Sequence, residues 1–255
     1  MPKTDLDTRE YWEGRLARQT NLQGTGHRAF SLDTNYWLYR SQHECLDQVL
    51  EQNHVQANGA KVLDVGSGTG YWVDYYLKRQ AASVTGVDLT VTSRQYLEEN
   101  FPAGIFYTAD ISEPYLPFEG GFDIISAMGV LYHIVDEARF QQALSNLTNL
   151  LKPGGYLVIS DAFQAPLLPA ARHARLRSLE EYQPVLTANQ VKIIDLLPVY
   201  YLANRTFIPV IGPWVINQLK LGKFFYGLDN RLRSRKLSNG TGLKTLLARK
   251  ETGAG

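Results

Sequence analysis

The sequence has a single cysteine, Cys45, among its 255 residues. One cysteine excludes a disulfide framework and a cysteine-based zinc site, and it suits a reducing compartment. Opposite charges nearly cancel, with 26 Lys and Arg against 25 Asp and Glu, so the net charge of +1 does not by itself indicate a nucleic-acid partner. No apolar run reaches the roughly 18 residues of a membrane span, and the polar N-terminus lacks the apolar core of a signal peptide. We therefore expect a cytoplasmic protein.

Glycine is concentrated where residues 62–72 have the sequence VLDVGSGTGYW. The apolar start suits a buried strand, and the aromatic end suits the beginning of a helix. Between them, Gly66, Gly68 and Gly70 alternate with small hydroxyl residues. Glycine accepts unusual backbone angles and has no side chain that would keep a ligand away from the backbone. This stretch therefore indicates either a ligand-binding loop or a tight strand-to-helix turn.

Acidic residues end the next two apolar runs. Residues 82–88 lead to Asp88, which lies 20 residues after Gly68, and residues 105–111 contain Asp110. A carboxylate at the position of Asp88 can accept hydrogen bonds from the ribose hydroxyls of an adenosine cofactor, whether S-adenosylmethionine (SAM) or NAD. Asp110 could instead cap the turn that follows it. The spacing thus predicts an adenosine-containing ligand without choosing between the two cofactors.

The order of the motifs makes that choice. Asp64 with the three alternating glycines resembles the first motif of class I SAM-dependent methyltransferases, whereas dinucleotide folds usually have G-x-G-x-x-G. The stretch GVLYHI at 129–134 resembles the "VLxHI" segment of many small-molecule methyltransferases, and LKPGGYL at 151–157 resembles another landmark of the family. An NAD-dependent oxidoreductase, which remains an alternative, would not explain Asp110 or the turn at 153–155. The resemblance is clear over residues 60–163 and weak beyond them.

The resemblance implies an α/β, Rossmann-like fold with a seven-stranded, mostly parallel sheet, an antiparallel last strand and helices on both faces. We expect an N-terminal helical cap over residues 1–58 and a SAM-binding domain over residues 59–255. Helical insertions are expected at about 164–186 and 207–239. The sequence further predicts a helix over 187–196, a sixth strand over 197–203 and a seventh over 242–249.

By the same resemblance, the cofactor is SAM. Asp88 would bind the ribose, Asp110 the adenine amino group, and Ile111 would pack on the adenine ring. The residues expected to bind the cofactor are Asp64, Gly66, Ser67, Gly68, Gly70, Asp88, Leu89, Asp110, Ile111, Met128 and Gly129. An aromatic face can stabilise the cationic sulfur, so Tyr36, Trp37 and Tyr11 are candidates to face the cofactor or the substrate. We expect Tyr36, Trp37 and Asp161 to bind the substrate. The alternative is that these aromatic residues only join the helices to the core.

We expect a methyltransferase that acts by in-line displacement, largely through positioning. His133 is the first candidate for a catalytic base, because the pKa of histidine lies near neutrality. His27 and Asp161 are weaker candidates, and His133 could instead order the loop around the cofactor. No His-x-x-x-His pair or cysteine pair is present, so the sequence predicts a metal-independent enzyme.

The acceptor is expected to be a small molecule, most simply an oxygen nucleophile of a secondary metabolite, with no nucleic-acid partner. N- or C-methylation, non-catalytic use of SAM and another SAM-dependent reaction remain alternatives. The protein would be a monomer or a homodimer. Residues 207–239 combine aromatic with basic side chains, and they could form a packed helix, a substrate cap or dimer contact, or a surface for a membrane or nucleic acid.

Overall fold

The computed structural model describes residues 8–164, 173–202, 211–235 and 242–252. Seven strands form one sheet in the order β3-β2-β1-β4-β5-β7-β6. The strands are β1 Lys61–Val65, β2 Ser83–Asp88, β3 Ile105–Thr108, β4 Phe122–Met128, β5 Leu151–Asp161, β6 Val191–Pro198 and β7 Lys244–Lys250. The first five strands pair in parallel, and β7 lies antiparallel between β5 and β6. The predicted Rossmann-like fold is therefore confirmed.

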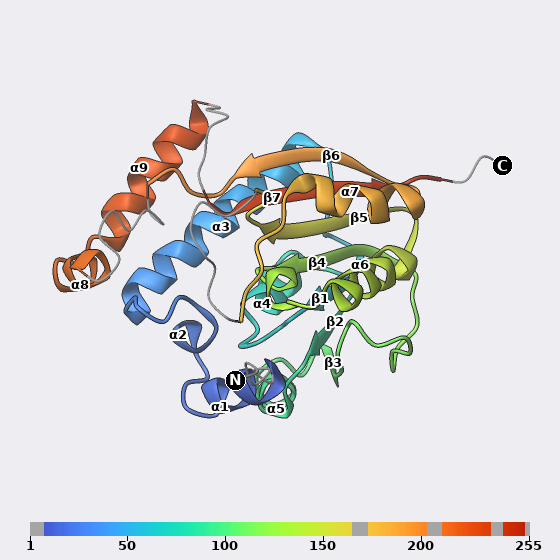
Figure 1. Cartoon of the computed structure of the whole chain (residues 1–255), viewed down its shortest axis with the longest axis horizontal. Coiled ribbons are helices and arrows are strands. Elements are labelled where there is room, and N and C mark those ends of the chain that lie inside the picture. Colours follow the sequence, from blue (N-terminus) through green and yellow to red (C-terminus); the bar gives the residue numbers. More distant parts are fainter. Residues whose placement is uncertain (1–7, 165–172, 203–210, 236–241, 253–255) are drawn as a thin grey trace, which may run out of the picture.

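Helices cover both faces of this sheet (Figure 1). The elements outside the sheet are α1 Thr8–Leu16, α2 Leu22–Thr25, α3 Leu32–Gln52, α4 Tyr71–Lys78, α5 Val91–Asn100, the short 3-10 helix η1 Leu131–His133, α6 Glu137–Leu150, α7 Leu179–Ala188, α8 Ile211–Gln218 and α9 Gly222–Ser234. The division into a cap over residues 1–58 and a SAM-binding domain over residues 59–255 stays a prediction. The insertion expected at 164–186 lies partly outside the described residues, as do both ends of the one at 207–239.

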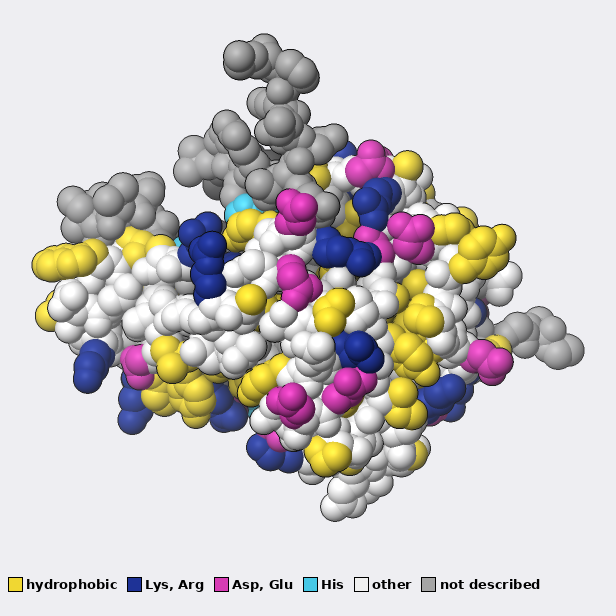
Figure 2. Space-filling view, turned by 90° about the horizontal axis from the view of Figure 1, so that it is seen from below, with side chains coloured by type: hydrophobic (Ala, Val, Ile, Leu, Met, Phe, Trp, Pro, Cys, Tyr) yellow, Lys and Arg dark blue, Asp and Glu magenta, His cyan; other side chains and the backbone are white. Residues whose placement is uncertain are grey.

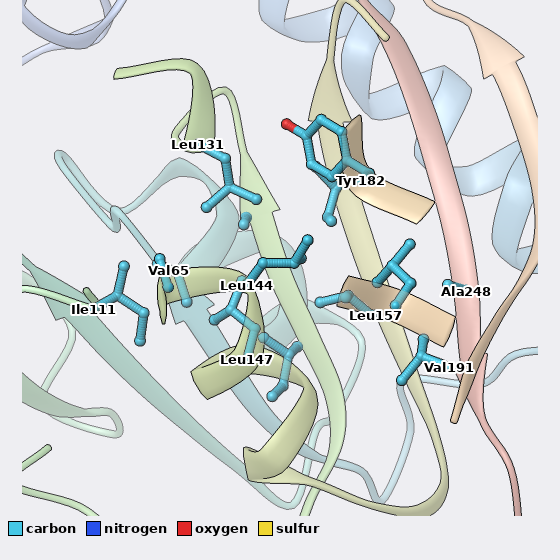
Figure 3. Packing of buried hydrophobic residues seen from close by; sticks show 14 of the residues in the cluster. Val65, Ile111, Leu131, Leu144, Leu147, Leu157, Tyr182, Val191 and Ala248 are labelled. Carbon is cyan, nitrogen blue, oxygen red and sulfur yellow. The ribbon is translucent and has the colours of Figure 1, made fainter. Parts of the chain in front are cut away.

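Alternate residues of each strand supply two hydrophobic cores. On one face, Leu63 and Ile125 pack with Phe140 and Leu144 of α6 and with Tyr182 of α7. Figure 3 shows part of this cluster, with α6 residues facing the strands. On the other face, the neighbouring strand positions pack against α3, α4 and α5, through residues such as Val49, Tyr76 and Leu97. The alternation follows from the two-residue period of a strand, and it fixes the register of the parallel strands.

The helix expected over 187–196 is wrong, because Val191–Pro198 forms strand β6. The helix in this region ends earlier, at Ala188, and it begins after Ser178. Ser178 and Glu181 form a capping box in which the Glu181 carboxylate accepts the backbone N–H of Ser178 (2.7 Å). The residues that follow pair with β7 along their whole length, so sheet pairing decides their conformation.

Candidate functional site

The glycine loop lies at the carboxyl end of β1 and borders a cavity of about 990 Å³. Gly66, Gly68 and Gly70 all have positive φ angles, of +69°, +51° and +79°. A Cβ atom on Gly66 would overlap the side chain of Val130, and one on Gly68 would lie 2.7 Å from the Cγ2 atom of Thr25. Other residues therefore cannot replace these glycines without strain, and the backbone of Gly66 and Gly68 forms part of the cavity wall.

Asp88 lies at the end of β2 and lines the same cavity. One carboxylate oxygen accepts the backbone N–H of Gly68 (2.9 Å), and the other accepts the N–H and hydroxyl of Thr90 (2.9 and 2.7 Å). Burial raises the pKa of Asp88, although these hydrogen bonds partly offset it. A carboxylate has about four acceptor positions, so the three protein donors leave room for about one direct bond from a ligand hydroxyl.

Asp110 lies after β3 on the neighbouring part of the cavity wall. It accepts hydrogen bonds from the backbone and hydroxyl of Ser112, and it forms an ion pair with Arg139 at the start of α6. The nitrogen Nε of Arg139 also donates to the hydroxyl of Ser112 (3.0 Å). Asp110 is thus held in a fixed orientation by a turn and by a guanidinium that itself lines the cavity.

Asp64 does not line the cavity, although it belongs to the glycine motif. It is fully buried, and one of its oxygens accepts the hydroxyl of Ser126 (2.9 Å) while the other has no partner in the structure. Burial raises the pKa of Asp64 to about 7. The hydroxyl of Ser67 donates to the backbone carbonyl of Asp64 (2.9 Å), which braces the loop from behind. These two residues therefore shape the loop from inside the protein.

His133 ends η1 and lines the same cavity as the glycine loop. Its Nδ1 atom donates to the carbonyl oxygen of His173 (3.0 Å), so Nε2 carries the lone pair. The ring of Trp12 lies edge-on to the imidazole, with 4.9 Å between the ring centroids. Burial lowers the pKa of His133 to about 4. The imidazole is therefore neutral at pH 7, but it binds a proton weakly, which reduces its strength as a base.

Helix α1 covers the cavity with Thr8, Arg9, Trp12 and Leu16. It is fixed to the first turn of α5 by Glu13, whose carboxylate accepts the backbone N–H groups of Val91 (2.8 Å) and Thr92 (3.0 Å). N–H groups at a helix start have no partner within the helix, so a carboxylate there is favourable. Burial alone would raise the pKa of Glu13, but these hydrogen bonds outweigh it and lower the pKa.

We expect Glu13→Ala to loosen α1 and to weaken cofactor binding severalfold, because losing such a helix-start carboxylate costs about 1 kcal/mol. Hydrogen–deuterium exchange of the α1 amides should become faster. Glu98→Ala removes another acid, paired only with Arg94 one turn away on an exposed helix face, and serves as the control. Unchanged exchange in α1 of the Glu13 variant would show that Glu13 does not hold the helix.

Comparison with known families decides the class of the protein. The profile of the family described as "Methyltransferase domain" matches residues 36–211, more than half of the chain. The chain belongs to this methyltransferase family. This membership places the chain among the SAM-dependent methyltransferases, and its cofactor is SAM, as the motifs predicted. The two prominent acids and the glycine loop of the methyltransferase lie together around one cavity, as an adenosine-containing cofactor requires.

Solved structures confirm the fold of the methyltransferase. The magnesium protoporphyrin IX methyltransferase of Synechocystis with bound SAM has a TM-score of 0.60 at 15% identity, with 98% of this chain and 100% of that chain covered. The [4+2]-cyclase SpnF has a TM-score of 0.58 at 22% identity, with 81% of this chain and 80% of that chain covered. At these identities the likeness establishes the fold alone.

Curated relatives of the methyltransferase are named "tRNA U34 carboxymethyltransferase". The protein from Idiomarina loihiensis is 30% identical over 141 residues, covering 48% of this chain and 40% of its own length. The protein from Pseudomonas aeruginosa is 36% identical over 141 residues, covering 49% of this chain and 41% of its own length. The chain thus aligns with less than half the length of these relatives.

These names overturn two predictions. The small-molecule acceptor and the exclusion of a nucleic-acid partner are both wrong, because the relatives are named for a transfer to tRNA. A net charge of +1 averages over the whole surface, so it says little about a local binding face. The motifs lie in the half of the methyltransferase that holds the cofactor, and they carry no information on the acceptor.

The structure brings together most of the predicted cofactor-binding residues. Those that line the cavity are Gly66, Gly68, Asp88, Leu89, Asp110, Ile111, Met128 and Gly129, together with His133. Gly70 lies next to them as the N-cap of α4 and faces Phe101 and Leu97. No metal-binding group of three or more His, Cys, Asp or Glu side chains occurs among the described residues. The metal independence of the methyltransferase stays a prediction.

The predicted substrate residues do not lie in this cavity. Tyr36 is 44% exposed, and Trp37 packs against Tyr226 of α9, with 5.1 Å between ring centroids. Asp161 is fully buried and accepts the hydroxyl of Tyr182, and burial raises its pKa to about 6. His27 is an exposed loop residue that contacts Phe30. Of the candidates for a base, only His133 borders the cavity of the methyltransferase.

Several residues that line the cavity of the methyltransferase were not predicted from the sequence. Arg9 and Trp12 of α1, Thr25 of α2, Tyr39 of α3 and Arg139 of α6 all line the cavity. The hydroxyl of Tyr39 donates to that of Thr25 (2.9 Å), which joins α2 to α3 beside the glycine loop. Asn21 caps the segment around Thr25 as a short helix. The Asn21 cap was a local signal for α2, but no signal marked Arg139.

His133 should make the stability of the methyltransferase depend on pH. Its pKa is about 4 in the folded chain and about 6.5 in an unfolded chain, so the unfolded chain binds more protons between these values. The contribution of His133 to the free energy of unfolding is therefore lost as the pH falls from about 6.5 to about 4. Urea denaturation of wild type and His133→Asn across this range measures it. As the pH falls from about 6.5 to about 4, the free energy of unfolding of the wild type should decrease relative to that of His133→Asn. A difference between the two free energies that does not change with pH would contradict the prediction.

Proposed function

We propose that this methyltransferase modifies a base of tRNA. The observation that carries the proposal is the name shared by relatives from Idiomarina, Pseudomonas and Methylococcus, at 30 to 36% identity over about half of the chain. Because the chain aligns with less than half the length of these relatives, their substrate is transferred here as a proposal. It implies a location in the cytoplasm, where tRNA is found.

The walls of the cavity suit such an acceptor. Arg9 and Arg139 line it, and the side chain of Arg139 is 52% exposed although it is paired with Asp110, so cationic groups are present at the cavity wall. The ring of Trp12 also lines the cavity, and aromatic rings of this kind stack with unpaired bases. A base inside a duplex cannot enter a cavity, so the acceptor would be an unpaired base, as found in a tRNA loop.

The residues of this chain would act mainly by positioning. When bound, SAM supplies an electrophilic methyl group on a positively charged sulfur. Gly66, Gly68 and Asp88 would hold its adenosine part, and Arg139 would keep Asp110 in place for the adenine. The base would enter beside Trp12 of α1 and His133 of η1, which lie in contact with each other. The low pKa of His133 favours orientation of the acceptor over removal of a proton.

The test is transfer of a label from the cofactor to RNA. Purified protein is incubated with bulk bacterial tRNA and SAM that carries a tritiated methyl group, and the nucleosides are analysed by mass spectrometry after digestion. A parallel reaction uses a SAM analogue with a carboxymethyl group on the sulfur, since the relatives are named for that group. We expect a modified nucleoside from at least one donor, and none with duplex DNA.

The variant Asp88→Ala should give no labelled tRNA. This result would show that the label in the wild-type reaction does not come from a contaminating enzyme. If the wild-type protein binds SAM but labels no nucleoside with either donor, the proposal of a tRNA acceptor is wrong.

A further inference from the structure

Helices α8 and α9 form an edge of the molecule away from the sheet, on the left in Figure 1. Three large apolar side chains are mostly exposed there: Trp214 of α8 (63%), Leu219 of the connecting turn (64%) and Phe224 of α9 (59%). Hydrophobic side chains gather at the same edge in Figure 2. Single exposed apolar residues are common on protein surfaces, but three on one short helical hairpin form a patch. We call these three residues, with Lys220 and Lys223, the α8–α9 tip.

The exposed charges of the hairpin itself are of one sign. Residues 211–235 contain five basic residues and one acid, Asp229. Asp229 is fully buried and accepts the backbone N–H groups of Tyr201 and Leu202, so it presents no negative charge at the surface. Arg233 is buried as well and donates to the carbonyl of Val199 (2.7 Å). The other four basic residues are exposed: Lys220, Lys223, Arg231 and Arg235.

The two faces of α9 have separate roles. Gly222, Asp229 and Arg233 share the inner face, which is buried. Phe224, Arg231 and Arg235 recur at helical spacing on the opposite, exposed face. The inner face of α9 and Phe224 thus lie on different surfaces of the helix, so Phe224 can be replaced without disturbing the buried contacts.

The hairpin is firmly attached to the rest of the protein. Asn217 of α8 accepts the backbone N–H of Ser31 (2.8 Å) and donates to the carbonyl of Ala29 (2.9 Å). Gly222 lies against Thr34 and Trp37 of α3, and Tyr226 donates to Glu44, which also pairs with Arg40. The tip is therefore presented by a rigid base, and the nearby acid Glu44 already has a cationic partner.

We propose that the α8–α9 tip docks on an anionic lipid surface. The segment combines exposed Trp, Leu and Phe side chains with Lys and Arg, and it has no exposed acid. In such a combination the apolar side chains insert at the boundary of headgroups and acyl chains, and the cations contact anionic headgroups. Nucleic acid is less well matched, because Leu219 offers neither a ring to stack on a base nor a group to bind its edge. The described residues contain no helix long and apolar enough to span a membrane, so the contact would be peripheral.

The experiment is co-sedimentation of the full chain with vesicles. Vesicles of phosphatidylcholine alone are compared with vesicles that also contain phosphatidylserine, at low and high salt. We expect binding to the anionic vesicles that is at least about tenfold stronger than to the neutral ones and that weakens with salt. The variant Trp214→Ser/Leu219→Ser/Phe224→Ser tests the apolar part, and Lys220→Glu/Lys223→Glu tests the charge. Each variant should reduce binding at least about tenfold.

The matched control is Ile105→Ser/Tyr115→Ser. These residues are 55% and 90% exposed, and they lie on β3 and in the loop that follows it. The control should bind vesicles like the wild type. Absence of binding to anionic vesicles, or full binding by both tip variants, overturns the proposal. Binding of tRNA that is lost in the tip variants, without vesicle binding, would overturn it in favour of a nucleic-acid surface. Because SAM binding does not enter this readout, its result is independent of the proposed acceptor.

Discussion

Asp88→Ala is expected to weaken the binding of SAM by about 100-fold, because a hydrogen bond to a charged group contributes about 1.5–3 kcal/mol and a factor of ten corresponds to about 1.4 kcal/mol. The substitution removes the carboxylate that borders the cavity at the end of β2. It also removes the acceptor for the backbone N–H of Gly68, so the glycine loop loses a support at the same time. Isothermal titration calorimetry with SAM measures the effect.

The control for this variant is Asp74→Ala. Asp74 is an exposed acid on α4 that pairs with Lys78 one turn away, and it does not line the cavity. Its loss should leave the dissociation constant for SAM unchanged, since an exposed pair of this kind contributes little. If Asp88→Ala bound SAM as tightly as Asp74→Ala, Asp88 would not be a cofactor residue.

Gly66→Ala is expected to abolish measurable SAM binding and to destabilise the fold by more than about 1 kcal/mol, the approximate strain of a positive φ angle in a residue with a side chain. The added methyl group would also overlap Val130, which forms another part of the cavity wall. Either the loop or the segment after β4 must move, and both contribute to the site. Urea denaturation and SAM titration measure the two effects.

Gly59→Ala is the control that separates the effect of backbone strain from the effect of overlap with a neighbouring side chain. Gly59 has a positive φ angle of +72°, close to that of Gly66, but a Cβ atom there would have no neighbour within 4 Å. The control should therefore show the cost of backbone strain and keep its affinity for SAM. Equal behaviour of the two variants would mean that the close approach of Val130 to the loop has no role in the site.

The cofactor half of the site could be predicted because its signals are local. The glycine loop and Asp110 come shortly after a strand and Asp88 ends one, and parallel strands bring their carboxyl ends to one edge of the sheet. The conformation of each loop depends on a few neighbouring residues. Motif order was therefore enough to identify the fold and the cofactor, and most of the residues that it predicted for the cofactor line one cavity.

The acceptor half of the site depends on how the helices are rotated and packed, and short sequence motifs do not predict this. Tyr36, Trp37 and Tyr39 lie within one turn of α3 and point in different directions, because each residue turns the helix by about 100°. Only Tyr39 lines the cavity, whereas Trp37 packs against α9. Arg139 likewise reaches Asp110 only through tertiary packing. The identity of the acceptor was predicted wrongly for the same reason.

The central claim is that the cavity bordered by Gly66, Gly68 and Asp88 is a SAM site. Its most direct test is calorimetric titration of the purified protein with SAM, with S-adenosylhomocysteine and with NAD. We predict micromolar binding of the first two ligands, no binding of NAD, and SAM binding that is about 100-fold weaker in Asp88→Ala. Binding of NAD alone, or SAM binding that is unchanged in Asp88→Ala, would contradict the claim.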